Sequence, residues 1–490
     1  MNPILVAFLL GGYFLMLIII AQITGKSATT DTFFTANRKS PWFIVAFGMI
    51  GTTISGVTFI SVPGEVGNSA STYFEFIMGN LVGFWIVALV LLPVYYKLNL
   101  ISIYTYLEKR LGFYSYKSGS FFFLLSRTIG AAFRMYLVAE VLQLALFDAI
   151  GIPFAITVLI SIFLIWVYTY RGGVKTIIWT DSLQTIFLLS AVFLTIYYIF
   201  SSFDWSVAET LQKINEHPYS RIFEWDMKSG KYFFKQFIAG IFVTIVMVGL
   251  DQDMMQKNLT CKSLKEAQKN MLTFSAIFVF VVGMFLLLGV LLYIFANTNG
   301  IQLPQKSDYL FPMLALNHMN LMIGIFFLQG ITAANYASAD SALTSLTTAF
   351  CIDFLDIKNR PQEMMKKLLQ RTHIAFSFLL FMVIMIFRII NDQSVVVAVF
   401  KAAGYTYGPL LGLFAFGFLT RKQVKDRWVP LITICSPFIA WAVDANSEQL
   451  FNGYQIGFEL IIINGAITFL GLIFIQKKTS VSLKNVKDIG

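Results

Sequence analysis

The stretch that decides the fold is Gly51-Thr52-Thr53-Ile54-Ser55-Gly56-Val57-Thr58, in the middle of an apolar run near 42–62. Glycine and threonine are poor helix formers, and serine and threonine hydroxyls compete for backbone partners. A helix that loosens here frees carbonyl oxygens where water is absent, which is tolerable only if they face a cavity or a bound ion. A continuous helix with a packing face of small residues fits the same stretch. Both interpretations stay open at this point.

The sequence around this stretch is that of an integral membrane protein. Of its 490 residues, 57% are apolar and only 13% are charged, whereas soluble proteins are about 45–50% apolar and about 25% charged. A bilayer core of about 30 Å needs roughly 20 apolar residues per helix. Thirteen such runs lie near 3–24, 42–62, 73–98, 120–149, 152–170, 176–200, 232–253, 270–296, 321–352, 370–390, 394–419, 428–445 and 458–476. We therefore expect an all-α membrane protein with about 13 transmembrane helices.

The basic residues predict how these helices are oriented. With the N-terminus outside, the inner connections and the tail hold 26 of the 36 lysines and arginines, as the positive-inside rule requires. This topology accounts for the net charge of +10, so we expect no nucleic acid partner. The prediction is a multi-pass protein of the plasma (inner) membrane, embedded in the lipid bilayer, with its C-terminus in the cytoplasm.

Ionisable residues inside the predicted spans are functional candidates, because they are costly there. They are Glu75, Arg127, Arg134, Glu140, Asp181, Asp340, Arg388 and Lys401. Glu140 is six residues from Arg134 and could pair with it. Asp181 and Asp340 are harder to explain by pairing, since each sits among small polar residues.

The ninth span offers a surface that could bind a cation. At 100° per residue, Ala334, Ser338 and Ser341 fall on one stripe, flanked by Ala337 and Asp340. A hard monovalent cation prefers carbonyl, hydroxyl and carboxylate oxygens. Carbonyls of an interrupted second span and hydroxyls of this stripe would supply them. A packing seam of serine and alanine is the alternative, but it leaves the mid-span aspartate unexplained.

One motif resembles a known family. The segment 170–184 reads YRGGVKTIIWTDSLQ, which closely resembles the GG-x-x-x-V-x-W-T-D-x-x-Q signature of the sodium:solute symporter family. Pro63, Asp251-Gln252 and Asp353 also match the pattern of the family, and the resemblance extends over the chain. It implies a leucine-transporter-like fold with two five-helix repeats of inverted topology.

The resemblance also divides the single transmembrane domain, residues 1–490. It implies a peripheral first helix at 3–24, a first five-helix repeat at 42–200 and a second at 232–419. Two further peripheral helices follow at 428–476, and a cytoplasmic tail covers 477–490.

By the same resemblance, sodium binds to the carbonyls of Gly51, Ile54 and Ala334 and to hydroxyls of the ninth span. Ser338 matches one hydroxyl position. Ala337 stands at the other, where members commonly have serine or threonine, so that one ligand is missing.

A second cation site, found in some members, resembles Asp181 together with two hydroxyls of the ninth span. Ser341 matches one of them, and Asp340 stands where the other is usual. Two carboxylates facing one region would either bind a cation more strongly or keep a proton on one of them. The second site is therefore a cation site or a proton site.

The stretch from Thr52 to Pro63 is most similar to bacterial sialic acid symporters. This similarity suggests a solute site of Thr53, Ser55, Thr58, Phe76, Asn80 and Arg134. The three hydroxyl residues would donate hydrogen bonds, and an arginine would clamp a carboxylate. Arg127 is the alternative to Arg134. Lys401 is either a second anion contact or a structural partner of Glu75 or an aspartate, and we favour the structural pairing.

We therefore expect a sodium-coupled symporter that imports a small organic solute by alternating access, acting as a monomer with sodium as coupling ion and no other cofactor. The solute is expected to be acidic, such as sialic acid or another carboxylate, with a neutral sugar or amino acid as the alternative. A channel would need a continuous polar pore, and an enzyme would need a catalytic constellation such as HExxH. The sequence shows neither.

Overall fold

A computed structural model describes residues 3–25, 36–169, 173–203, 205–357, 360–390 and 394–477. Met1, the first residues of the signature as far as Gly172, and the tail beyond Lys477 lie outside this described part. Within it the chain is helical, and its only β contacts are two isolated bridges, Ser40 to Cys261 and Val424 to Gln476.

Nine helices of the described part are long and apolar enough to cross a bilayer. They are α1 (Pro3–Gly25), α5 continued by α6 (Tyr73–Ile86 and Leu92–Lys97), α8 (Phe113–Leu142), α10 (Gly173–Ser202), α14 (Leu264–Thr298), α16 (Leu321–Asp353), α17 (Gln362–Ile390), α18 (Val395–Leu419) and α19 (Val429–Ala445). Each corresponds to one of the predicted runs.

Two more spans are broken helices. The pair α3 (Trp42–Thr53) and α4 (Gly56–Ser69) bends by 58° at its break. The pair α12 (Phe233–Thr244), extended to Gly249, and α13 (Gln252–Asn258) bends by 68°. With these pairs the described part has up to eleven spans. The two broken helices come first in the two predicted repeats, whose boundaries stay a prediction.

The remaining predicted runs, near 152–170 and 458–476, correspond to the shorter apolar helices α9 (Phe154–Thr169) and α21 (Leu460–Phe474). Because both are short, the count of thirteen spans stays a prediction. Short helices connect the spans: α7 (Thr105–Arg110), α11 (Val207–Glu216), α15 (Leu310–Met313) and α20 (Ser447–Leu450).

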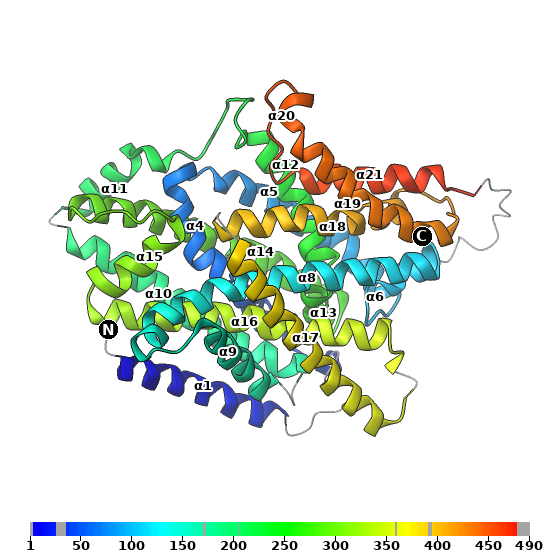
Figure 1. The fold of residues 1–490 in the computed structure, drawn as a ribbon, viewed down its shortest axis with the longest axis horizontal. Coiled ribbons are helices and arrows are strands. Elements are labelled where there is room, and N and C mark those ends of the chain that lie inside the picture. Colours follow the sequence, from blue (N-terminus) through cyan, green and yellow to red (C-terminus); the bar gives the residue numbers. More distant parts are fainter. Residues whose placement is uncertain are drawn as a thin grey trace.

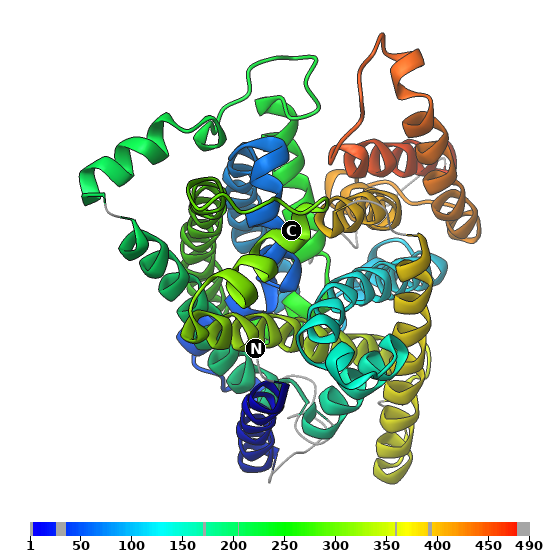
Figure 2. The same ribbon diagram turned by 60° about the vertical axis from the view of Figure 1, so that its left-hand side comes forward.

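The helices form one bundle with its most buried members in the middle (Figure 1). α16 packs against α3, α8 and α10, and α18 packs against α8. α1 lies at one rim and α19 and α21 lie at the opposite rim (Figure 2). α1 contacts α9, α10 and α16, while α21 contacts α18 and α19. The residues around the break at Ile54 and all of α13 are buried, while the first turns of α12 are partly exposed.

Candidate functional site

The α3–α4 helix is interrupted at Ile54 and Ser55. In a regular helix the Ser55 amide would donate to the Gly51 carbonyl, but here it donates to the Thr53 carbonyl at 3.0 Å. The Ile54 amide still donates to the Ile50 carbonyl at 2.8 Å, so α3 ends at this point. The change of partner releases the Gly51 carbonyl from the helical ladder. The structure thus decides between the two interpretations of this stretch in favour of a broken helix.

The residues predicted as sodium ligands on the ninth span lie on the buried surface of α16. Ala334, Ala337 and Ser338 are each at most 1% exposed, and α16 packs against both α3 and α4. The Ser338 hydroxyl accepts a hydrogen bond from Arg134 Nη1 at 3.5 Å. The structure therefore brings together the helices that carry the predicted ligands. Their role in binding sodium stays a prediction.

A cavity beside the break is lined by all six residues predicted to bind the solute. They are Thr53, Ser55, Thr58, Phe76, Asn80 and Arg134, from α3, the break, α4, α5 and α8. The cavity has a volume of about 100 Å³, whereas a cavity that holds benzene has about 150 Å³. A solute of sugar size fits only when the lining side chains move apart.

Aromatic side chains form much of the cavity wall. The rings of Tyr73 and Phe76 stack with centroids 5.4 Å apart, and Phe400 of α18 meets Phe76 edge-on at 5.1 Å. Phe458 lies against both Phe76 and Phe400, at 5.3 and 4.7 Å. These four rings come from α5, from α18 and from the segment before α21. Tyr73, Phe76 and Phe400 line the cavity, and Phe458 lies behind two of them. Relative movement of these elements would widen the cavity.

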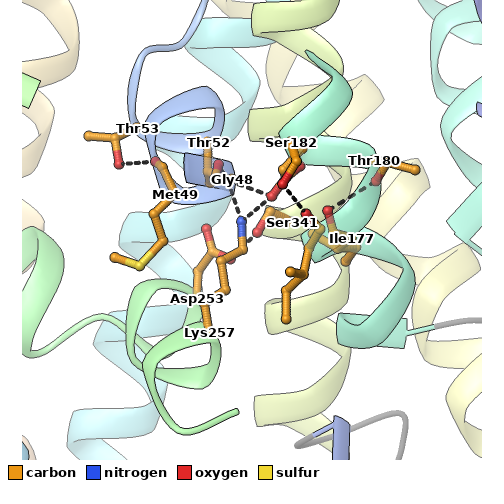
Figure 3. Close-up of polar contacts among 12 residues, drawn as sticks. Gly48, Met49, Thr52, Thr53, Ile177, Thr180, Ser182, Asp253, Lys257 and Ser341 are labelled. Carbon is orange, nitrogen blue, oxygen red and sulfur yellow. Dashed lines mark hydrogen bonds and ion pairs between the residues drawn. The ribbon is translucent and has the colours of Figure 1, made fainter. Parts of the chain in front are cut away.

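The hydroxyl of Thr53 has a hydrogen-bond partner within its own helix. Its Oγ1 donates to the Met49 carbonyl at 2.8 Å, within α3 (Figure 3). The single hydroxyl proton is therefore already engaged, and Thr53 offers only lone pairs to the cavity. While this bond is made, Thr53 can only accept a hydrogen bond from a solute, and its predicted role as a donor stays a prediction.

The two arginines that line the cavity differ in their partners. The Arg127 guanidinium forms a buried ion pair with Asp253 of α13. Arg134 contacts the neutral hydroxyl of Ser338, and no carboxylate among the described residues lies within salt-bridge distance of it. Arg127 is therefore neutralised inside the protein, while Arg134 keeps its charge for a ligand. This difference favours Arg134 over Arg127 as the anion contact, and that role stays a prediction.

The predicted second site is built differently from expectation. Asp181 of α10 accepts a hydrogen bond from Thr52 at 2.7 Å and forms an ion pair with Lys257 Nζ at 2.5 Å. The lysine nitrogen also donates to the Thr52 hydroxyl (Figure 3). Asp181 and Lys257 are both almost completely buried. A positive charge thus already lies at Asp181, and it belongs to the chain.

Ser341 and Asp340 do not complete this site in the expected way. The Ser341 hydroxyl donates to Asp253, the partner of Arg127, and not to Asp181 (Figure 3). Asp340 is fully buried in α16. The expected set of Asp181 and Ser341 is therefore divided between two ion pairs, one made by Lys257 and one by Arg127.

Sequence reasoning missed Lys257 and Asp253. Both residues follow the break between α12 and α13. In the sequence the apolar run ends near Asp253, which places Lys257 in a connection on the inner side of the membrane. The structure bends the chain back into the interior there, which buries α13. The charge pattern Asp251, Asp253, Lys257 on a short helix is the signal that could have revealed them. Asp251 accepts a hydrogen bond from the Tyr407 hydroxyl of α18 at 2.7 Å.

Two of the other intramembrane charges form ion pairs at the edges of the bundle, and a third, Glu75, is buried and has a backbone partner. Lys401 lies 3.7 Å from Asp444 of α19, an aspartate partner as favoured. Glu140 pairs with Arg388 at 3.3 Å, so the suggested pairing with Arg134 is wrong. Glu75 accepts a hydrogen bond from the backbone amide of Glu224 at 2.8 Å.

Replacing Gly51 by alanine is expected to weaken sodium binding. The added methyl would lie 2.6 Å from Thr185 Oγ1 and 3.0 Å from the Asp181 carbonyl, so α3 must move away from α10. Such overpacking costs about 1–3 kcal/mol. We expect the sodium concentration for half-maximal uptake to rise roughly fivefold or more. Gly11→Ala is the matched control, because no atom lies within 4 Å of its added methyl. Unchanged sodium dependence in Gly51→Ala would contradict a role of this carbonyl.

Comparison with known proteins gives consistent results. A model of the sodium:solute symporter family matches residues 33–425. The sodium/sialic acid symporter NanT of Aliivibrio fischeri is 26% identical over 454 residues, covering 90% of this chain and 88% of NanT. The corresponding symporter SiaT of Proteus mirabilis is also 26% identical, covering 94% of both chains. The solved structure of a substrate-bound, outward-open Na⁺-coupled sialic acid symporter has a TM-score of 0.81 at 21% identity, covering 97% of this chain and 99% of that one.

Proposed function

The chain belongs to the sodium:solute symporter family, and from this premise we propose that it imports an organic acid of the sialic acid class together with sodium. The family makes it a sodium-coupled transporter and not an enzyme, with the leucine-transporter-like fold that its structural neighbours share. What the proposal adds is the chemistry of the solute and the residues that bind it.

The observation that carries the proposal is the unpaired charge of Arg134 in the cavity. Its guanidinium is half-buried, lines the cavity with hydroxyl and amide side chains, and has no carboxylate partner among the described residues. A positive charge with little access to water favours a negatively charged ligand, and a bidentate carboxylate would compensate it. Ser55, Thr58 and Asn80 would bind hydroxyl and amide groups of the same solute. The names of NanT and SiaT agree with a solute that carries both kinds of group.

Sodium would couple to the solute through Ser338. Sodium bound by the carbonyls of Gly51, Ile54 and Ala334 needs the Ser338 hydroxyl as a further ligand. That hydroxyl is the contact of Arg134, so sodium and the guanidinium compete for its oxygen. Sodium would thereby turn Arg134 towards the solute and raise the affinity for a carboxylate. Coupling of this kind requires the ion to bind one conformer better than the other.

A neutral sugar or amino acid is the alternative solute. The cavity has two guanidinium groups, of which only Arg127 is paired with a carboxylate, and this excess of positive charge favours an anion.

We further propose that the protein acts as a monomer in the inner membrane, with its N-terminus outside and its C-terminus in the cytoplasm. The distribution of basic residues supports this orientation.

Uptake into proteoliposomes tests the proposal. With an inward sodium gradient, we expect accumulation of sialic acid but not of the matched neutral sugar N-acetylmannosamine. Replacing external sodium by choline, or dissipating the gradient with a sodium ionophore, should reduce accumulation to the level of protein-free liposomes. Sodium-driven accumulation of the neutral sugar at the same rate would contradict an acidic solute. Conductance without solute would instead indicate a channel.

A further inference from the structure

A buried lysine occupies the place where a second coupling cation would be expected. Lys257 Nζ lies 2.5 Å from Asp181 Oδ2 and donates to the hydroxyl of Thr52. Thr52 in turn donates to the same carboxylate at 2.7 Å. The side chains of Lys257 and Asp181 are 2% and 0% exposed. Ammonium, carboxylate and hydroxyl thus form one compact, buried group, and the contact of Lys257 with Thr52 is drawn in Figure 3.

The three residues of this group come from three different helices. Lys257 belongs to α13, the second half of one broken helix, and Thr52 belongs to the last turn of α3, before the break of the other. Asp181 belongs to α10, which packs against α3. One ammonium group therefore joins both broken helices to α10. These are the elements between which a coupling ion would act.

The ammonium group leaves no favourable place for a sodium ion at Asp181. Like a bound sodium ion, it carries one positive charge and contacts oxygen atoms only. A second positive charge on the same carboxylate would be repelled strongly, because the surroundings have a low dielectric constant. Removing only the lysine would leave a buried carboxylate without compensation. A carboxylate, a hydroxyl and the space vacated by the side chain would then attract a small cation.

We propose that Lys257 is a tethered counter-ion, a positive charge of the chain itself that takes the place of an exchangeable cation at Asp181. This inference rests on the proposed function, because it concerns how many sodium ions accompany the solute. It assigns no sodium to Asp181, where the sequence led us to expect either a cation or a proton. The charge of Lys257 moves with α13 and stays with the protein through the whole cycle.

Counting the sodium ions bound to purified protein tests the inference. Equilibrium binding of radioactive sodium in detergent at pH 8, with choline as the replacing cation, gives the number bound at saturation. We expect Lys257→Ala to bind one sodium ion more than the native protein. Lys401→Ala is the matched control, since it removes a lysine that pairs with Asp444 at the edge of the bundle, and it should bind the native number.

A second variant keeps the test decisive if Lys257→Ala does not fold. The double variant Asp181→Asn with Lys257→Met replaces the ion pair by neutral side chains of similar size, and we expect it to bind the native number of sodium ions. A number one lower in this variant would show that Asp181 binds sodium and would overturn the inference. An unchanged number in folded Lys257→Ala would also overturn it. Both outcomes are judged against the number of sodium ions that the native protein binds. A native protein that neither binds sodium nor transports would instead refute the proposed function.

Discussion

Arg134→Ala is expected to weaken the binding and uptake of acidic solutes strongly while the protein stays folded. Arg134 is the cavity arginine that has no carboxylate partner among the described residues, so its removal leaves no uncompensated charge behind. Losing one partner of a buried, hydrogen-bonded charge pair costs about 2–5 kcal/mol. This corresponds to a loss of affinity of roughly 30-fold or more. Initial rates of sialic acid uptake over a range of concentrations measure the change.

Two variants serve as controls for Arg134. Arg134→Lys keeps the charge but loses the bidentate geometry, so we expect an intermediate loss. Arg388→Ala removes an arginine that pairs with Glu140 away from the cavity and should leave the affinity for the solute unchanged. If Arg134→Ala transports sialic acid with native affinity, the carboxylate binds elsewhere. Equal losses for Arg134→Ala and Arg388→Ala would indicate damage to the fold.

Breaking the ion pair between Arg127 and Asp253 is expected to destabilise the protein strongly. Both side chains are buried, and Asp253 also accepts the hydroxyl of Ser341. Removing one partner of such a pair costs about 3–5 kcal/mol, because the other charge stays buried without compensation. We therefore expect Asp253→Asn and Arg127→Met each to lower the midpoint of thermal unfolding in detergent. Circular dichroism or the fluorescence of a thiol-reactive dye can follow unfolding.

The double variant distinguishes the ion pair from general packing. Arg127→Met with Asp253→Asn removes both charges, so it should be more stable than either single variant. If the two losses simply add, the residues do not act as a pair. The uptake rate of the folded double variant then shows whether transport itself needs the ion pair between α8 and α13. Stability is measured separately by thermal unfolding.

Much of this architecture follows from local sequence. The run of glycine, threonine and serine from Gly51 to Gly56 supports a helix poorly, which left a break and a continuous helix both open, and the structure shows the break there. The six residues suggested for the solute line one cavity. The helix break depends on residues that are neighbours along the chain. The set of cavity residues follows from the resemblance to a family in which these positions lie together.

The ion pairs could not be predicted in the same way. Whether Asp181 pairs with a sodium ion or with Lys257 depends on where α13 turns after its 68° bend, and no local pattern fixes that angle. Counting basic residues by connection also assumes that each charge near the end of a span reaches water. Lys257 violates this assumption because its helix folds back into the interior.

The ammonium of Lys257 sets a limit on how steeply the carrier can concentrate its cargo. A free ion that enters with the solute yields about 2.3 kcal/mol for each 100 mV of membrane potential, enough for a further roughly 50-fold accumulation. A charge that belongs to the polypeptide returns with the empty carrier and yields none of this energy. Such a carrier forgoes the larger gradient, but each molecule imported admits fewer ions that the cell must pump out again.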